Sequence, residues 1–174
     1  MPDRVVEFKS AAFPKYPNEN EELVNDNCWG KRLAEYLRDH LPKHGVATGD
    51  ILCEDWGWLV YVENADFPLW IGCGVMDEGD DDENAGDGDE EDDHSSHDDP
   101  GKYAMPPSTQ PKLPKGVNEF IMHVNAEPGF LKRLFRKVDT APAVERAERA
   151  IQDMMAAAPD AFQDVKWMDT SPKR

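Results

Sequence analysis

Several short segments alternate apolar and polar residues, which is the pattern of strands with one buried face. In residues 4–9, Val6 and Phe8 face one way and Glu7 the other. Residues 58–62 and 67–75 flank the turn-forming sequence ENAD, so we predict a hairpin there. The complete set of predicted strands is 4–9, 46–53, 58–62, 67–75, 118–124 and 162–168.

Three other segments have the three- and four-residue spacing of amphipathic helices. The first begins near Asp26 or Asn27, either of which can cap it, and ends at Pro42 and Gly45. The second, residues 131–137, is short and basic. The third begins at Thr140 and Pro142, and Pro159 ends it; its apolar side consists of Val144, Ala147, Ile151, Met154, Met155 and Ala158.

One strand of the hairpin has an unusual face. Phe67, Leu69 and Ile71 alternate with Trp70, Gly72 and Gly74, so two glycines occupy alternate positions on one side. Glycines in a strand indicate a bend or a close approach by another group. We predict a helix packed on the glycine side, in preference to a ligand.

Strands joined by short connections, together with helices, predict an α+β fold. We expect a mainly antiparallel sheet of about five strands, with the helices packed on one face. At 174 residues the chain suits a single domain, 1–174. An acidic insertion at 77–100, followed by a proline-rich loop at 101–116, interrupts it.

The formal net charge of −17 is concentrated in that insertion. Residues 76–99 hold 14 acids and no Lys or Arg; without them, 36 acids become 22, against 19 basic residues. Like charges without apolar residues predict disorder. Because the whole chain contains no basic stripe, we do not expect direct nucleic-acid binding.

Three further features indicate the cellular compartment of the protein. The cysteines Cys28, Cys53 and Cys73 are odd in number and lie in apolar surroundings, as expected of thiols in a reducing compartment. The N-terminal residues lack the apolar stretch of a signal peptide, and no window approaches the length of a membrane helix. We therefore expect a cytoplasmic protein that has no membrane partner.

Two parts of the insertion resemble metal sites. Asp80, Asp82, Asn84 and Glu91 match positions of an EF-hand loop, but Ala85 replaces the glycine of its sharp turn. The pair His94 and His97 lacks the closed ligand set of a metal site. We predict neither a bound metal nor a cofactor.

The basic helix 131–137 suggests a membrane or nucleic-acid surface, although such a helix commonly buries its apolar side and leaves its cations in water. A second hypothesis is intramolecular, with the acidic insertion folding over this basic patch.

The most compact candidate site is EDWGW, at the entrance of the hairpin. Glu54, Asp55, Trp56 and Trp58 combine aromatic anchors with charge, as protein interfaces do. The alternative is an enzyme or ligand-binding domain that uses Glu54, Asp55 and His123. Adjacent strand residues point to opposite faces, and the chain has no nucleophile elbow, phosphate loop, HExxH or CxxC.

Five segments of the chain together resemble a group of small bacterial proteins: EDWGW, the helix WGKRLAEYLRDHL, the strand NEFIMHV, the helix LKRLFRK and the ending FQDVKWM. The resemblance implies no activity, and the acidic insertion departs from it. We predict a non-enzymatic macromolecule-binding protein, of a regulatory or toxin-immunity type, whose acidity suits a basic protein partner.

Overall fold

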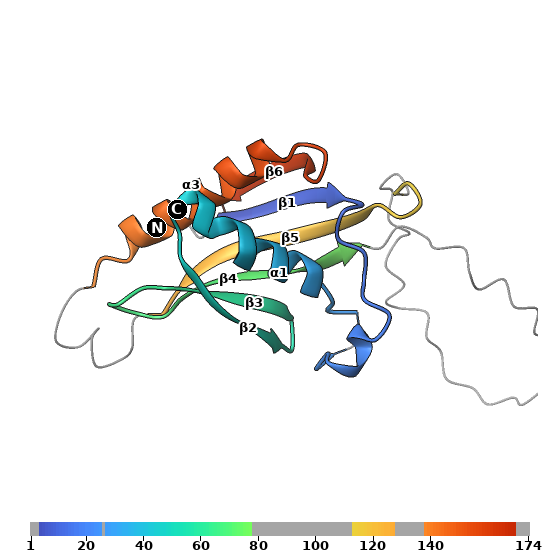
Figure 1. Ribbon diagram of the computed structural model, residues 1–174, viewed down its shortest axis with the longest axis horizontal. Coiled ribbons are helices and arrows are strands. Elements are labelled where there is room, and N and C mark those ends of the chain that lie inside the picture. Colours follow the sequence, from blue (N-terminus) through green and yellow to red (C-terminus); the bar gives the residue numbers. More distant parts are fainter. Residues whose placement is uncertain (1–3, 26, 78–112, 128–137, 170–174) are drawn as a thin grey trace, which may run out of the picture.

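A computed structural model describes residues 4–25, 27–77, 113–127 and 138–169. Its central feature is one sheet of six antiparallel strands in the order β2-β3-β4-β5-β1-β6 (Figure 1). The strands are β1 (Arg4–Ser10), β2 (Thr48–Glu54), β3 (Gly57–Val62), β4 (Leu69–Asp77), β5 (Asn118–Ala126) and β6 (Gln163–Asp169).

In the described ranges two α-helices, α1 (Lys31–His40) and α3 (Ala141–Ala157), accompany the sheet, with the short 3-10 helices η1 (Glu19–Glu21) and η2 (Leu41–His44). Figure 1 shows α1 crossing the sheet and α3 beside β1 and β6. The predicted α+β class and antiparallel sheet are confirmed, with six strands in place of about five. The predicted hairpin is also confirmed, because β3 and β4 pair from Trp58 and Cys73 to Val62 and Leu69.

The core lies between the sheet and the two helices. Leu33 and Leu37 of α1 and Ile151 of α3 are buried in one cluster with Phe8 and Phe120 of the sheet. The Phe8 and Phe120 rings stack with centroids 5.6 Å apart. Every alternate residue of β1 from Val6 and of β5 from Asn118 to Val124 is buried. The period-two pattern therefore identifies the face that the helices cover.

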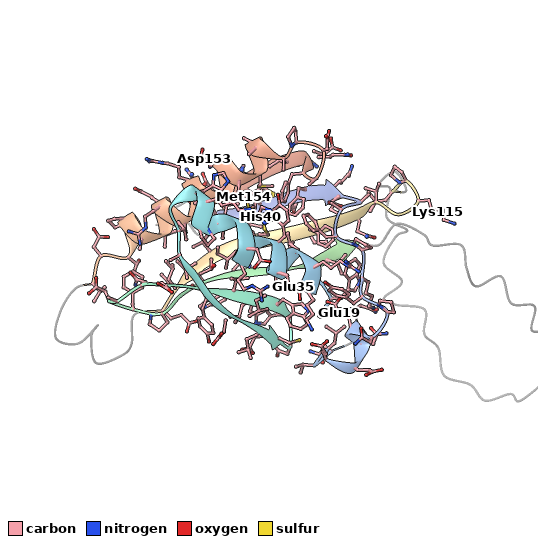
Figure 2. The ribbon with its side chains drawn as sticks, in the orientation of Figure 1. Glu19, Glu35, His40, Lys115, Asp153 and Met154 are labelled. Carbon is pink, nitrogen blue, oxygen red and sulfur yellow. The ribbon has the colours of Figure 1, made fainter. Side chains whose placement is uncertain are left out.

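The start of α1 differs from the prediction. The helix begins at Lys31, after Gly30, so Trp29 precedes it. Of the two predicted caps, Asn27 has a φ of 67° and Asp26 lies outside the described residues. Its capping group is the carboxylate of Glu19, which comes from η1 and is completely buried (Figure 2). Oε1 of Glu19 accepts hydrogen bonds from the backbone N–H groups of Gly30 and Lys31, both at 2.8 Å.

This arrangement satisfies backbone donors that have no partner within the helix. Oε2 of Glu19 also accepts the Tyr16 N–H at 3.2 Å, so one carboxylate joins the approach to η1 with the start of α1. A negative charge at this end is favoured by the helix dipole. Sequence reasoning missed Glu19 because it searched for caps next to the helix.

The predicted end of α1 is confirmed. The chain continues from His40 into η2, where Pro42 occupies the first turn, and Gly45 ends it in a left-handed conformation with φ of 82°. At α3, Thr140 precedes the helix but makes no side-chain capping bond. Asp139 Oδ1 accepts the Ala141 N–H at 3.1 Å in its place.

Several predictions fall on other parts of the chain. The acidic insertion beyond Asp77 lies outside the described residues, together with its EF-hand-like residues and its histidine pair. So do most of the loop 101–116 and the basic helix 131–137. Within the described part, neither helix has the length and apolarity that crossing a membrane requires.

Candidate functional site

The prediction of a helix on the glycine side of β4 is wrong. Aromatic side chains cover this side at Gly72, and the backbone of Trp56, Gly57 and Trp29 lies against it at Gly74. A Cβ atom on Gly72 would lie 2.8 Å from Trp56 Cη2 and 2.8 Å from His123 Nε2. Glycine is required at this position because two rings occupy the space of a side chain. The helices cover the opposite face, and we call the glycine side the open face of the sheet.

Trp56 reaches the open face from the tight turn between β2 and β3. Glu54 pairs with Gly57 across this turn, and Gly57 has a φ of 144°, which side chains rarely adopt. A Cβ there would also lie 2.7 Å from the carbonyl oxygen of Cys73. Asn25 Nδ2 donates a hydrogen bond of 2.6 Å to the Asp55 carbonyl, which fixes the turn to the preceding segment.

Trp56, Trp70 and His123 form what we call the aromatic cluster. Trp56 and Trp70 stack with centroids 5.4 Å apart and an interplanar angle of 25°. His123 lies 5.4 Å from Trp56 and 5.3 Å from Trp70, the latter edge-on. These separations are in the favourable range for offset and edge-to-face pairs. The cluster is a packed unit built from β4, β5 and the β2–β3 turn.

Exposed apolar side chains gather around this cluster. Directly opposite residues of paired strands share a face, so Leu52 lies with Leu59, and Tyr61 with Trp70, on the open face. Leu52 is 44% exposed, Trp56 41% and Tyr61 39%. Met168, which lies opposite Val5, also belongs to this face. The described part of the chain has seven exposed large apolar residues, and these four are among them. The open face therefore has an apolar centre.

Charge divides the open face into two parts. Strands β2 to β5 contain no Lys or Arg, whereas Asp50, Glu54 and Glu119 supply negative charge. Strands β1 and β6 supply the cations of this face, Lys9, which pairs with Asp164 at 3.0 Å, and Lys166, which lies opposite Glu7. Arg4 lies on the helix side, where it pairs with Glu148 of α3. The apolar centre is thus bordered by carboxylates on the β2–β3 side.

The residues of EDWGW separate in the structure. Trp56 is exposed on the open face, whereas Trp58, two residues later, is 4% exposed and belongs to the core. The ammonium of Lys31 lies 5.3 Å from the Trp58 ring centre on that side. Glu54 lies on the open face by its register, and Asp55 is exposed at the turn. The structure therefore brings Glu54, Asp55 and Trp56 together and places Trp58 elsewhere.

The proposed trio of Glu54, Asp55 and His123 is spread across the sheet. Glu54 is on β2 and His123 on β5, three strand spacings apart, or about 14 Å. The Trp56 ring contacts His123 and occupies the intervening surface. Within the described ranges, no three His, Cys, Asp or Glu side chains are grouped so that they can hold a metal ion.

The thiols near the site are held in their neutral form. Cys53 donates from Sγ to the Glu54 carbonyl at 3.7 Å, and burial raises the pKa of this thiol. Complete burial raises the pKa of Cys73, which lies on the core side of β4. A cysteine nucleophile needs a lowered pKa and access to solvent, and these two thiols have the opposite environment.

Sequence reasoning missed Trp70, Leu52 and Tyr61 as members of this surface. The signal for Trp70 was present, because it alternates with Gly72 and Gly74. Comparison with protein-family models, with curated proteins and with solved structures found no match to the chain.

Proposed function

We propose that this chain is a non-enzymatic protein that binds a basic partner protein through the open face of its sheet. The observation that carries the proposal is the concentration of Leu52, Trp56 and Tyr61 on the β2–β3 half of one face, beside Glu54 and Asp55. Contiguous exposed apolar surface with a polar rim is characteristic of interaction sites. Exposed Trp and Tyr are the residue types that contribute most to such interfaces.

The sign of the charge supports a basic partner. The four strands that carry the apolar centre contain no cation, and the whole chain has a net charge of −17. Complementary charge accelerates association and excludes acidic competitors. A regulatory or immunity-type factor that covers a basic surface has this combination of features. The three unpaired cysteines support a reducing compartment such as the cytoplasm as its place of action.

The proposal is tested by affinity capture followed by measurement on purified proteins. The immobilised chain is incubated with lysate of its source cells at several salt concentrations, and captured proteins are identified by mass spectrometry. A captured basic protein is then purified, and its Kd is measured by calorimetry with the wild type, Trp56→Ala and Val165→Ala. Val165 is the matched control, because it is an exposed apolar residue on the distant edge strand β6.

Truncation of a central tryptophan costs about 2 kcal/mol, so Trp56→Ala should weaken binding roughly 30-fold. Val165→Ala should leave the Kd within about two-fold. Thermal melts of both variants establish that they are folded. Equal affinity of folded Trp56→Ala and wild type, or capture that is insensitive to salt, would contradict the proposal.

A further inference from the structure

The Trp56 ring is only partly enclosed. One face stacks on Trp70, and the six-membered ring lies over Gly72 beside His123. The residue nevertheless retains 41% exposure, so part of Trp56 faces solvent. The turn that carries it is fixed at Asp55 by Asn25 and at Gly57 by its close approach to Cys73. Trp56 is therefore a preorganised aromatic platform.

Three aromatic rings elsewhere in this chain are in contact with cations. Lys15 lies 5.9 Å from the centre of Trp29, Lys31 lies 5.3 Å from Trp58, and the guanidinium carbon of Arg32 lies 3.8 Å from Tyr16. The negative ring face attracts these cations. The strands around Trp56 contain no Lys or Arg, and its neighbours along the chain are Asp55 and Glu54. The strands beneath Trp56 therefore provide no Lys or Arg to neutralise the negative ring face and the two acids.

We propose that the platform binds an arginine side chain of the partner, whose guanidinium stacks on the outer face of Trp56 and donates to the carboxylates of Glu54 and Asp55. This inference rests on the proposed function and names the chemistry at its centre. Arginine fits better than lysine because its planar group stacks on an indole and presents several donors at once. Stacking on Trp56 leaves the guanidinium edge free for these two acids, so both contacts form together.

The test uses the full chain and a short synthetic peptide of alternating glycine and arginine. Binding is followed by NMR at the Trp56 indole N–H, which Trp56→Leu identifies by its disappearance. Peptides with lysine or citrulline in place of arginine serve as comparisons, since citrulline keeps the planar shape and lacks the charge. The buried Trp58 indole is an internal control.

The arginine peptide should shift the Trp56 resonance in a saturable manner and leave that of Trp58 unchanged. A cation–π contact at an exposed site is worth about 0.5–1 kcal/mol, so Trp56→Leu should weaken peptide binding about two- to five-fold by calorimetry. Asp55→Asn and Glu54→Gln should each weaken it by a similar factor. The lysine peptide should bind more weakly, and the citrulline peptide should cause no shift.

Three results would overturn the inference: an unmoved Trp56 resonance, equal binding of the citrulline or lysine peptide, or unchanged affinity of folded Trp56→Leu. The last would assign peptide binding to acids elsewhere in the chain. If partner capture still depends on Trp56 while the arginine peptide fails, the docking face stands and its arginine anchor is refuted.

Discussion

Replacement of Glu19 by alanine should be among the most damaging single changes in this chain. Glu19 belongs to η1, before α1, and is completely buried. Its carboxylate is the acceptor for the N–H groups of Gly30 and Lys31 at the start of α1 and for the N–H of Tyr16. Alanine removes all three acceptor contacts and leaves a cavity beside buried backbone donors.

The magnitude follows from those contacts. A hydrogen bond to a charged group contributes about 1.5–3 kcal/mol, and the two bonds of 2.8 Å together contribute about 3–6 kcal/mol. Water that enters the cavity recovers part of this, so we expect Glu19→Ala to lower the free energy of unfolding by about 4 kcal/mol. Proteins of this kind have about 5–15 kcal/mol in total. Glu19→Gln keeps an acceptor oxygen without the charge, and about half of that loss is expected.

Urea denaturation followed by tryptophan fluorescence and far-UV circular dichroism measures these differences. Glu21→Ala is the matched control, since Glu21 belongs to the same 3-10 helix and is exposed. Its free energy of unfolding should stay within about 0.5 kcal/mol of the wild type. If Glu19→Ala and Glu21→Ala unfold at the same urea concentration, or Glu19→Gln is as stable as wild type, Glu19 is not the cap that α1 requires.

Three further outcomes are expected. Burial raises the pKa of Glu148 above its ordinary 4.5, although Arg4 lies nearby. The protonated side chain therefore contributes to folding stability fully below about pH 4.5, and this contribution is lost as pH rises through the raised pKa. Glu148→Gln should accordingly lose less stability than wild type as pH rises above about 4.5, and parallel urea-midpoint curves would refute this. Gly72→Ala should displace the Trp56 ring and cost about 1–3 kcal/mol, seen as a changed fluorescence spectrum; an unaltered spectrum and midpoint would count against the close contact. Cys73 should react with maleimide only at the rate of unfolding, because it is buried with a raised pKa, and labelling as fast as in urea would exclude that burial.

The fold was largely predictable because local patterns and tertiary structure agree. Alternation in residues 58–62 and 118–124 identified the buried faces, and Pro42 with Gly45 marked the end of α1. The start of α1 was not predictable in the same way. Its cap is Glu19, which is 12 residues from Lys31, and a contact across a folded loop leaves no local pattern.

The candidate site was predictable in composition and unpredictable in assembly. Sequence indicated Glu54, Asp55 and Trp56, and it placed Trp70 and two glycines on one face. It could not show that Trp56 covers Gly72, because that contact depends on the β2–β3 turn and on the register of β4. For the same reason, the sequence could not show that Trp58 belongs to the core while Trp56 lies on the open face, because this depends on which face of β3 the helices cover.

The two halves of the open face show why stability alone does not account for the aromatic cluster. On β1 and β6 the same face carries the charged residues Glu7, Lys9 and Lys166, and Lys9 pairs with Asp164. On β2 and β3 it exposes Leu52, Trp56 and Tyr61, although polar residues at those positions would satisfy a solvated face. Exposed apolar surface favours association with other chains, and we propose that a partner covers this half of the face. A charged substitution such as Tyr61→Lys should then leave folding intact and abolish capture of that partner.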